Sequence, residues 1–183
     1  MARDDDEEGR PELSDQVNIG IVGSRRRVSL LDRTVIREFL ERCLSHYVDR
    51  EVVVVSGGCP RGADRFAEES ARLLGIRTIV HPVVKPGDPP VLHRGDFRER
   101  AFARNELIAR DSDVLFALVH HDRTGGTENT VRHAIRLGKT VFVVDDTGLL
   151  YLQKGGRGSE EDAARDTPGQ LPVGQREDDT PQV

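Results

Sequence analysis

The chain has 183 residues, of which 36% are hydrophobic, with only two cysteines and a formal net charge of −5. A chain of this length can bury one hydrophobic core, and it has no apolar run long enough to cross a membrane. Two cysteines do not form a disulfide framework, and the acidic N-terminus lacks the basic and apolar regions of a signal peptide. These features exclude a membrane-spanning or disulfide-scaffold protein and predict a cytoplasmic one.

Charge is unevenly distributed along the chain. Residues 1–18 and 145–183 each carry a net charge of −5, which leaves the segment between them at +5. A basic body with acidic ends suits a polyanionic ligand, and the ends either compete for the same surface or simply solubilise the protein. Composition predicts disordered tails at 1–16 and 148–183, the second rich in Gly, Pro and acids, around one domain at 17–147.

Within that domain, strand and helix patterns alternate. Short β-branched or apolar runs predict strands at 17–22, 51–55, 77–82, 113–119 and 140–144. Apolar residues at helical spacing predict helices at 32–48, 63–74, 97–110 and 128–137. Strands that alternate with single helices imply parallel pairing through right-handed crossovers. We therefore predict an α/β fold, a Rossmann-like three-layer sandwich with a mostly parallel sheet of about five strands and helices on both faces.

Two glycine-rich turns lie at the edge where such a sheet binds ligands, beyond the carboxyl ends of its strands. One reads SGGCPRGAD after the second strand, and the other reads DRTGGTENT after the fourth. Glycines let backbone N–H groups approach an anion, and the helix that follows adds the positive end of its dipole. Thr127 is expected to cap the second of these helices. The two turns predict a phosphate site.

Arginines support the same interpretation. Nine of them map to this edge or to a helix start beside it: Arg25, Arg26, Arg27, Arg61, Arg94, Arg98, Arg100, Arg104 and Arg123. Guanidinium groups bind phosphate oxygens bidentately, so their clustering at one edge favours an anion site.

Other residue types give weaker signals. Asp64 and Glu128 fall in helix first turns, where acids are common caps but also suit a ribose-binding or catalytic role. Cys59 is expected to be inert, and His120 and His121 end a strand, where ligand contact and solvent exposure are equally consistent with the sequence. The chain has no metal-ligand spacing such as HxxE or CxxC, so no metal and no required cofactor are predicted.

Taken together, four motifs resemble the SLOG superfamily, the Rossmann-like group that joins the LOG proteins, the Smf/DprA proteins and the YpsA-related proteins. They are GSR after the first strand, SGGCPRGAD, ARNELIARDSDVLFALV and GGTENTVRHAIRLGKTVFVV, and they cover about residues 18–145. The stand-alone size and the GAD and GGT motifs look most like the YspA/YpsA-related branch, which the resemblance associates with nucleotide-derived ligands. Resemblance also implies a possible homodimer.

The LOG branch pairs an RN-type arginine with a PGGxGTxxE loop whose glutamate serves N-glycosidic cleavage. Arg104 matches that arginine, but here Glu128 follows the threonine directly, and the proline and one glycine are missing. DprA proteins, which bind single-stranded DNA, show a similar RNxxI helix but usually carry extra domains. Few aromatic residues lie in the loops of this chain, which argues against stacking single-stranded DNA.

The first hypothesis is therefore a sensor or ligand-binding module for a nucleotide or nucleotide-derived phosphate compound. The alternatives are a phosphoribohydrolase acting on nucleoside 5′-monophosphates, with Glu128 and Arg104 as catalytic residues, and single-stranded DNA binding. Asp64 or Glu128 would bind a ribose hydroxyl. The expected binding residues are Gly23, Ser24, Arg25, Ser56, Gly57, Gly58, Arg61, Gly62, Asp64, Arg104, Asn105, Thr124, Gly125, Gly126 and Thr127.

Overall fold

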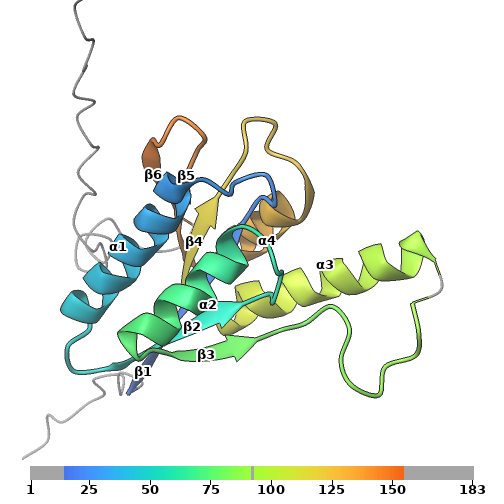
Figure 1. Ribbon diagram of the computed structural model, residues 1–183, viewed down its shortest axis with the longest axis horizontal. Coiled ribbons are helices and arrows are strands. Elements are labelled where there is room, and N and C mark those ends of the chain that lie inside the picture. Colours follow the sequence, from blue (N-terminus) through green and yellow to red (C-terminus); the bar gives the residue numbers. More distant parts are fainter. Residues whose placement is uncertain (1–14, 92, 155–183) are drawn as a thin grey trace, which may run out of the picture.

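The computed structural model describes residues 15–91 and 93–154 (Figure 1). These residues form a Rossmann-like three-layer α/β sandwich, as the sequence predicts. The predictions for residues 1–14 and for those beyond Lys154 fall outside the described part of the chain. No helix in the described part is long and apolar enough to cross a membrane.

The central sheet has the strand order β3-β2-β1-β4-β5-β6. Its strands are β1 (Gln16–Gly23), β2 (Glu51–Ser56), β3 (Arg77–Val80), β4 (Val114–Leu118), β5 (Thr140–Val144) and β6 (Leu150–Lys154). The first five are parallel, and β6 runs antiparallel to β5 along the edge. The chain order reverses between β1 and β4, which in open α/β sheets is where a ligand crevice forms.

Strand β6 differs from the prediction. It falls inside the segment 148–183 that composition assigns to a disordered tail, so the sheet has six strands where about five were expected. A short turn leads into it, in which the Asp145 carboxylate accepts hydrogen bonds from the backbone N–H groups of Thr147 and Leu149, each at 3.0 Å. The folded domain therefore continues to at least Lys154.

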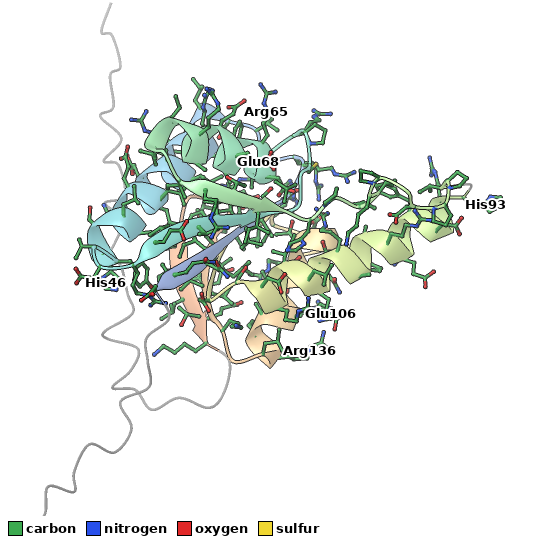
Figure 2. All side chains as sticks on the ribbon, turned by 90° about the horizontal axis from the view of Figure 1, so that it is seen from below. His46, Arg65, Glu68, His93, Glu106 and Arg136 are labelled. Atoms are coloured by element: carbon green, nitrogen blue, oxygen red, sulfur yellow. The ribbon has the colours of Figure 1, made fainter. Side chains whose placement is uncertain are left out.

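Two helices cover each face of the sheet. They are α1 (Leu30–His46) and α2 (Ala63–Leu74) on one face, and α3 (Arg94–Asp111) and α4 (Gly125–Arg136) on the other. Figure 2 shows Arg65 and Glu68 of α2 on the opposite side of the sheet from Glu106 of α3 and Arg136 of α4. The N-terminal half of α3 extends beyond the sheet, with His93 at its tip (Figures 1 and 2).

Strand residues alternate between the two cores, as the pleat requires. Ile19, Ile21 and Phe116 pack on the α1 and α2 side, where Phe39 stacks on Phe116 with ring centroids 4.3 Å apart. Leu115 and Ala117 pack on the other side against α3 and α4. Continuous apolar runs in the sequence therefore reflect strands buried on both faces.

A buried ion pair joins the loop after β1 to the start of α1. Nη2 of Arg27 lies 2.6 Å from Oδ1 of Asp32, and both side chains are less than one-tenth exposed. Nη1 of Arg27 also donates to the carbonyls of Val119, at 2.7 Å, and Val144, at 3.3 Å, which follow β4 and end β5. Asp32 in turn forms a capping box with Ser29. One guanidinium thus joins the β1 loop, a helix N-terminus and two strand ends.

We expect Arg27→Met to lower the free energy of unfolding by about 3–5 kcal/mol, because it leaves the Asp32 carboxylate buried without its partner. Urea denaturation measures this change. The matched control is Arg33→Met, which removes an exposed ion pair to Glu69 at 3.2 Å and should cost no more than about 1 kcal/mol. Equal losses in the two variants would show that the Arg27 pair contributes no more than a surface pair.

Candidate functional site

A cavity of about 550 Å³ lies at the crevice between the carboxyl ends of β1 and β4. Its lining residues come from the end of β1 and the loop after it, the first turn of α2 and the loop before it, α3, and the N-terminal part of α4 with its N-cap. They are Val22, Gly23, Ser24, Arg25, Arg26, Cys59, Asp64, Phe97, Arg98, Ala101, Phe102, Arg104, Asn105, Ile108, Thr124, Gly125, Gly126, Thr127 and Thr130.

The N-terminus of α4 forms one wall of the cavity. The helix begins at Gly125, three residues earlier than predicted, and its N-cap is Thr124 rather than Thr127. In the described structure, the Thr124 side chain makes no capping hydrogen bond, and the side chains of Asn105 and Thr130 donate to the Gly126 carbonyl rather than accept from the first-turn N–H groups. Gly125 has a φ of 81°, a left-handed conformation that glycine adopts without strain. The first-turn N–H groups of α4 are therefore free for an external acceptor.

Helix α3 forms the opposite wall. Phe97, Ala101, Asn105 and Ile108 recur at helical spacing and place one face of the helix on the cavity. The side chains on this face are aromatic at the N-terminal end of the helix, at Phe97, and aliphatic at the end nearest the sheet, at Ile108. Phe102 also lines the cavity, and the guanidinium of Arg98 lies 5.2 Å from its ring centroid. The sequence analysis did not identify Phe97 and Phe102 as site residues. Their positions in the same predicted helix as Arg104 and Asn105 were the available signal.

Arg104 reaches across from α3 to the glycine loop after β2. Its Nη1 donates to the Gly57 carbonyl at 2.5 Å and lies 3.6 Å from Oδ2 of Asp64. Its Nε is buried and has no hydrogen-bond partner in the described structure. Burial lowers the pKa of this guanidinium, although Asp64 opposes that effect.

Asp64 is the buried carboxyl of the cavity. It lies in the first turn of α2, is 6% exposed, and Oδ2 accepts a hydrogen bond from the Cys59 backbone at 3.0 Å. Burial raises its pKa to about 6, against the opposing effects of the Cys59 hydrogen bond and the Arg104 charge. A carboxyl with this pKa exchanges its proton close to neutral pH.

Ten of the fifteen residues predicted to bind phosphate line the cavity. Those that do not are Ser56, the last residue of β2, and Gly57, Gly58, Arg61 and Gly62 in the loop after it. Of that loop, only Cys59 reaches the wall, together with Asp64 just beyond it. The Gly57 carbonyl is instead the acceptor for Arg104, and Ser56 accepts a hydrogen bond from the Gly58 backbone at 3.0 Å. Most of this loop therefore lies outside the cavity lining, and the Gly57 carbonyl contributes indirectly by holding Arg104.

Glu128 also lies outside the cavity lining. Its Oε2 is 2.6 Å from Nε of Arg123 and its Oε1 is 3.5 Å from Nε of Arg132, so the carboxylate is turned toward two arginines. Arg123, in turn, contacts the Tyr151 hydroxyl from β6. The structure therefore brings Arg104 to the cavity but not Glu128.

The nine arginines of this edge have different partners. Arg25, Arg26, Arg98 and Arg104 line the cavity. Arg27 is the buried partner of Asp32, Arg100 lies 3.8 Å from Asp88, and Arg123 pairs with Glu128. The interpretation of Arg27 as part of an anion cluster is therefore corrected, because its guanidinium is already paired and only 8% of the residue is exposed.

Neither the comparison with family models nor the search of curated proteins found a match to this chain. The resemblance to the SLOG superfamily stays a prediction that rests on the four sequence motifs.

We expect Gly57→Ala to destabilise the protein by about 1–3 kcal/mol through overpacking. A Cβ at Gly57 would lie 1.6 Å from Nη1 of Arg104 and 2.7 Å from Oδ2 of Asp64, so the arginine must move. Gly95→Ala is the control, since no heavy atom outside the helix lies within 4 Å of its Cβ position, and helix propensity predicts a gain of up to about 1 kcal/mol. Thermal or urea unfolding compares them, and a neutral Gly57→Ala would contradict this tight contact.

Asp64 should make the protein less stable as pH rises from about 4 to about 6. Its folded pKa of about 6 exceeds the unfolded value of about 3.9, so in this window the native state binds the extra proton. The contribution of Asp64 is most favourable below pH 4 and is lost through pH 6, by at most about 1.4 kcal/mol per pH unit. Urea denaturation of wild type and Asp64→Asn across this range measures it. A stability difference between the two that stays flat with pH would contradict the raised pKa.

Proposed function

We propose that the protein binds a nucleotide or a nucleotide-derived phosphate compound in this cavity, as a sensor or ligand-binding module. The observation that carries the proposal is the N-terminus of α4, which lines the cavity without a capping side chain and whose first-turn acid, Glu128, is directed to Arg123 instead. Backbone N–H groups at a helix N-terminus bind phosphate through hydrogen bonds and the helix dipole. Ser24 and Arg25 line the same cavity and add a hydroxyl and a positive charge.

The two glycine turns differ in their capacity for an external anion. At α2, the first turn already holds Asp64, whose carboxylate accepts the Cys59 N–H and neighbours Arg104. At α4, the first-turn acid Glu128 is directed to Arg123. A phosphate is therefore favoured at α4 and disfavoured beside Asp64, which suits a sugar hydroxyl instead.

Size and chemistry of the cavity support a nucleotide rather than a bare anion. Small-molecule pockets span about 300–1,000 Å³, and 550 Å³ falls within that range. Phe97 and Phe102 provide aromatic surface on which a base can stack, a contact worth about 1–3 kcal/mol per base. Phosphate, sugar and base would thus each have a chemically matched wall.

The position of Glu128 favours binding over LOG-like hydrolysis. A catalytic carboxylate must reach the reacting bond, whereas Glu128 contacts Arg123 and Arg132. Asp64 is the carboxyl that lines the cavity, and its pKa of about 6 suits a general acid. Any release of free base from a bound nucleotide should therefore depend on Asp64, and an Asp64→Asn variant separates this activity from binding.

Thermal shift with nucleoside mono-, di- and triphosphates and ADP-ribose tests the proposal. A ligand that binds only the folded state stabilises it by about 2.7 kcal/mol at a hundredfold excess over its Kd. We expect one compound class to raise Tm in wild type and in Arg61→Ala, whose exposed arginine lies in the loop after β2 but outside the cavity lining. Arg25→Ala and Thr127→Asp should lose the shift.

Thr127→Asp is informative because it should fold well. A carboxylate in the first turn of α4 stabilises the helix by about 0.3–1 kcal/mol yet repels a phosphate at the same N-terminus. An unliganded Tm equal to or above wild type, with the nucleotide shift lost, would support the site. Retention of the nucleotide shift in this variant would place the ligand elsewhere. If only oligonucleotides stabilise the wild-type protein, and salt weakens that effect steeply, the result would favour single-stranded DNA binding instead.

A further inference from the structure

A second cluster of ligand-type side chains lies beyond the ends of β4 and β5, outside the cavity lining. It consists of His120, His121 and Asp146. One ring nitrogen from each histidine and one carboxylate oxygen lie within 4.8 Å of one another. We propose that these three residues bind a first-row divalent transition metal ion of the Zn²⁺ type. No metal was expected from the sequence, because the ligands follow no short spacing motif and meet only through the parallel pairing of β4 with β5.

The separation of two of the ligand atoms, those of His121 and Asp146, is close to what such an ion requires. Zn²⁺ binds imidazole nitrogen and carboxylate oxygen at about 2.0–2.2 Å, so two ligands at a tetrahedral angle lie about 3.3–3.5 Å apart. Nδ1 of His121 and Oδ2 of Asp146 are 3.1 Å apart. His121 is 70% exposed at its side chain and Asp146 is 33% exposed, so small rotations can complete the geometry.

His120 supplies an independent observation. Its Nδ1 is buried and has no hydrogen-bond partner in the described structure, and its ring packs on that of His121 with centroids 4.0 Å apart. A buried ring nitrogen without a partner is costly, and a metal site accounts for the pairing of the rings.

Backbone structure holds the ligands in place from two loops. A turn in which the Arg123 N–H donates to the His120 carbonyl at 2.9 Å brings adjacent histidines to the same side. Asp146 follows Asp145, whose carboxylate accepts hydrogen bonds from the Thr147 and Leu149 backbones. A carboxylate oxygen of Asp122 lies 3.6 Å from Nδ1 of His120, beyond hydrogen-bond distance, and adds negative charge beside the cluster.

Nitrogen ligands decide the class of ion. Imidazole favours Zn²⁺, Ni²⁺, Co²⁺ and Cu²⁺, whereas Mg²⁺ and Ca²⁺ prefer sites made only of oxygen. Three protein ligands leave a fourth position for water or another ligand. Bound metal would link the loops after β4 and β5 and stabilise the folded state by mass action.

Isothermal titration calorimetry of the full chain with Zn²⁺ tests the proposal. Titration with Mg²⁺ is the control for non-specific cation binding by the acidic segments 1–18 and 145–183. We expect one Zn²⁺ per chain, a Tm increase reversed by EDTA, and no comparable binding of Mg²⁺. His121→Ala and Asp146→Asn should each weaken Zn²⁺ binding by more than about tenfold. Even the loss of a residue that only hydrogen-bonds a metal ligand usually lowers metal affinity by about that factor. Both side chains are on the surface, so these variants should keep the wild-type Tm without metal.

Two matched variants separate this site from other zinc ligands. His133→Ala, in α4, and Cys59→Ser, in the cavity, should bind Zn²⁺ like wild type. Co²⁺ absorption supplies a further readout, because ligation by nitrogen and oxygen gives no thiolate charge-transfer band. Absent Zn²⁺ binding, or binding unchanged in His121→Ala and Asp146→Asn, would overturn the proposal and leave His121 and Asp146 as a surface ion pair only.

Discussion

The buried guanidinium of Arg27 is the interaction on which the ligand edge of the sheet depends. It joins Asp32 at the start of α1 to the carbonyls of Val119 and Val144. The loop that contains Ser24 and Arg25 precedes Arg27, His120 follows Val119, and Asp145 follows Val144. Both candidate sites therefore include loops that adjoin Arg27 or the atoms that it holds. Because replacing a buried ion pair by well-packed apolar residues is often neutral, we infer that this pair contributes more to loop geometry than to net stability.

Helix α3 converts that fixed edge into a cavity. It extends beyond the sheet (Figure 1) and presents one face of side chains across from the N-terminus of α4. Arg104 then connects α3 to the loop after β2 through the Gly57 carbonyl and Asp64. The absence of a side chain at Gly57 is what admits the arginine, so a glycine outside the cavity lining still shapes the cavity.

The fold was predictable because periodicity reports burial directly. The helix at Ala63–Leu74 and the strand at Thr140–Val144 match their predicted bounds. Strand β6 was missed because LYLQK is short and adjoins a polar segment, and pairing with β5 decides its conformation. Within the site, glycines gave an ambiguous signal. Gly125 and Gly126 line the cavity, whereas the backbones of Gly57 and Gly58 hydrogen-bond to the side chains of Arg104 and Ser56. Sequence alone does not say whether a glycine makes room for a ligand or for an arginine.

The arginine excess at this edge has a structural explanation as well as a functional one. Parallel strands with right-handed crossovers direct helix N-termini to the same edge, and α1, α2 and α4 each carry an acid in the first turn, Asp32, Asp64 and Glu128. Each acid has its own arginine, Arg27, Arg104 and Arg123 respectively. These pairs neutralise the chain's own acids and add no net charge for a ligand. In the described structure, Arg25 and Arg98 line the cavity without a carboxylate in ion-pair contact, so attraction for an external anion comes from these two residues and the α4 N-terminus.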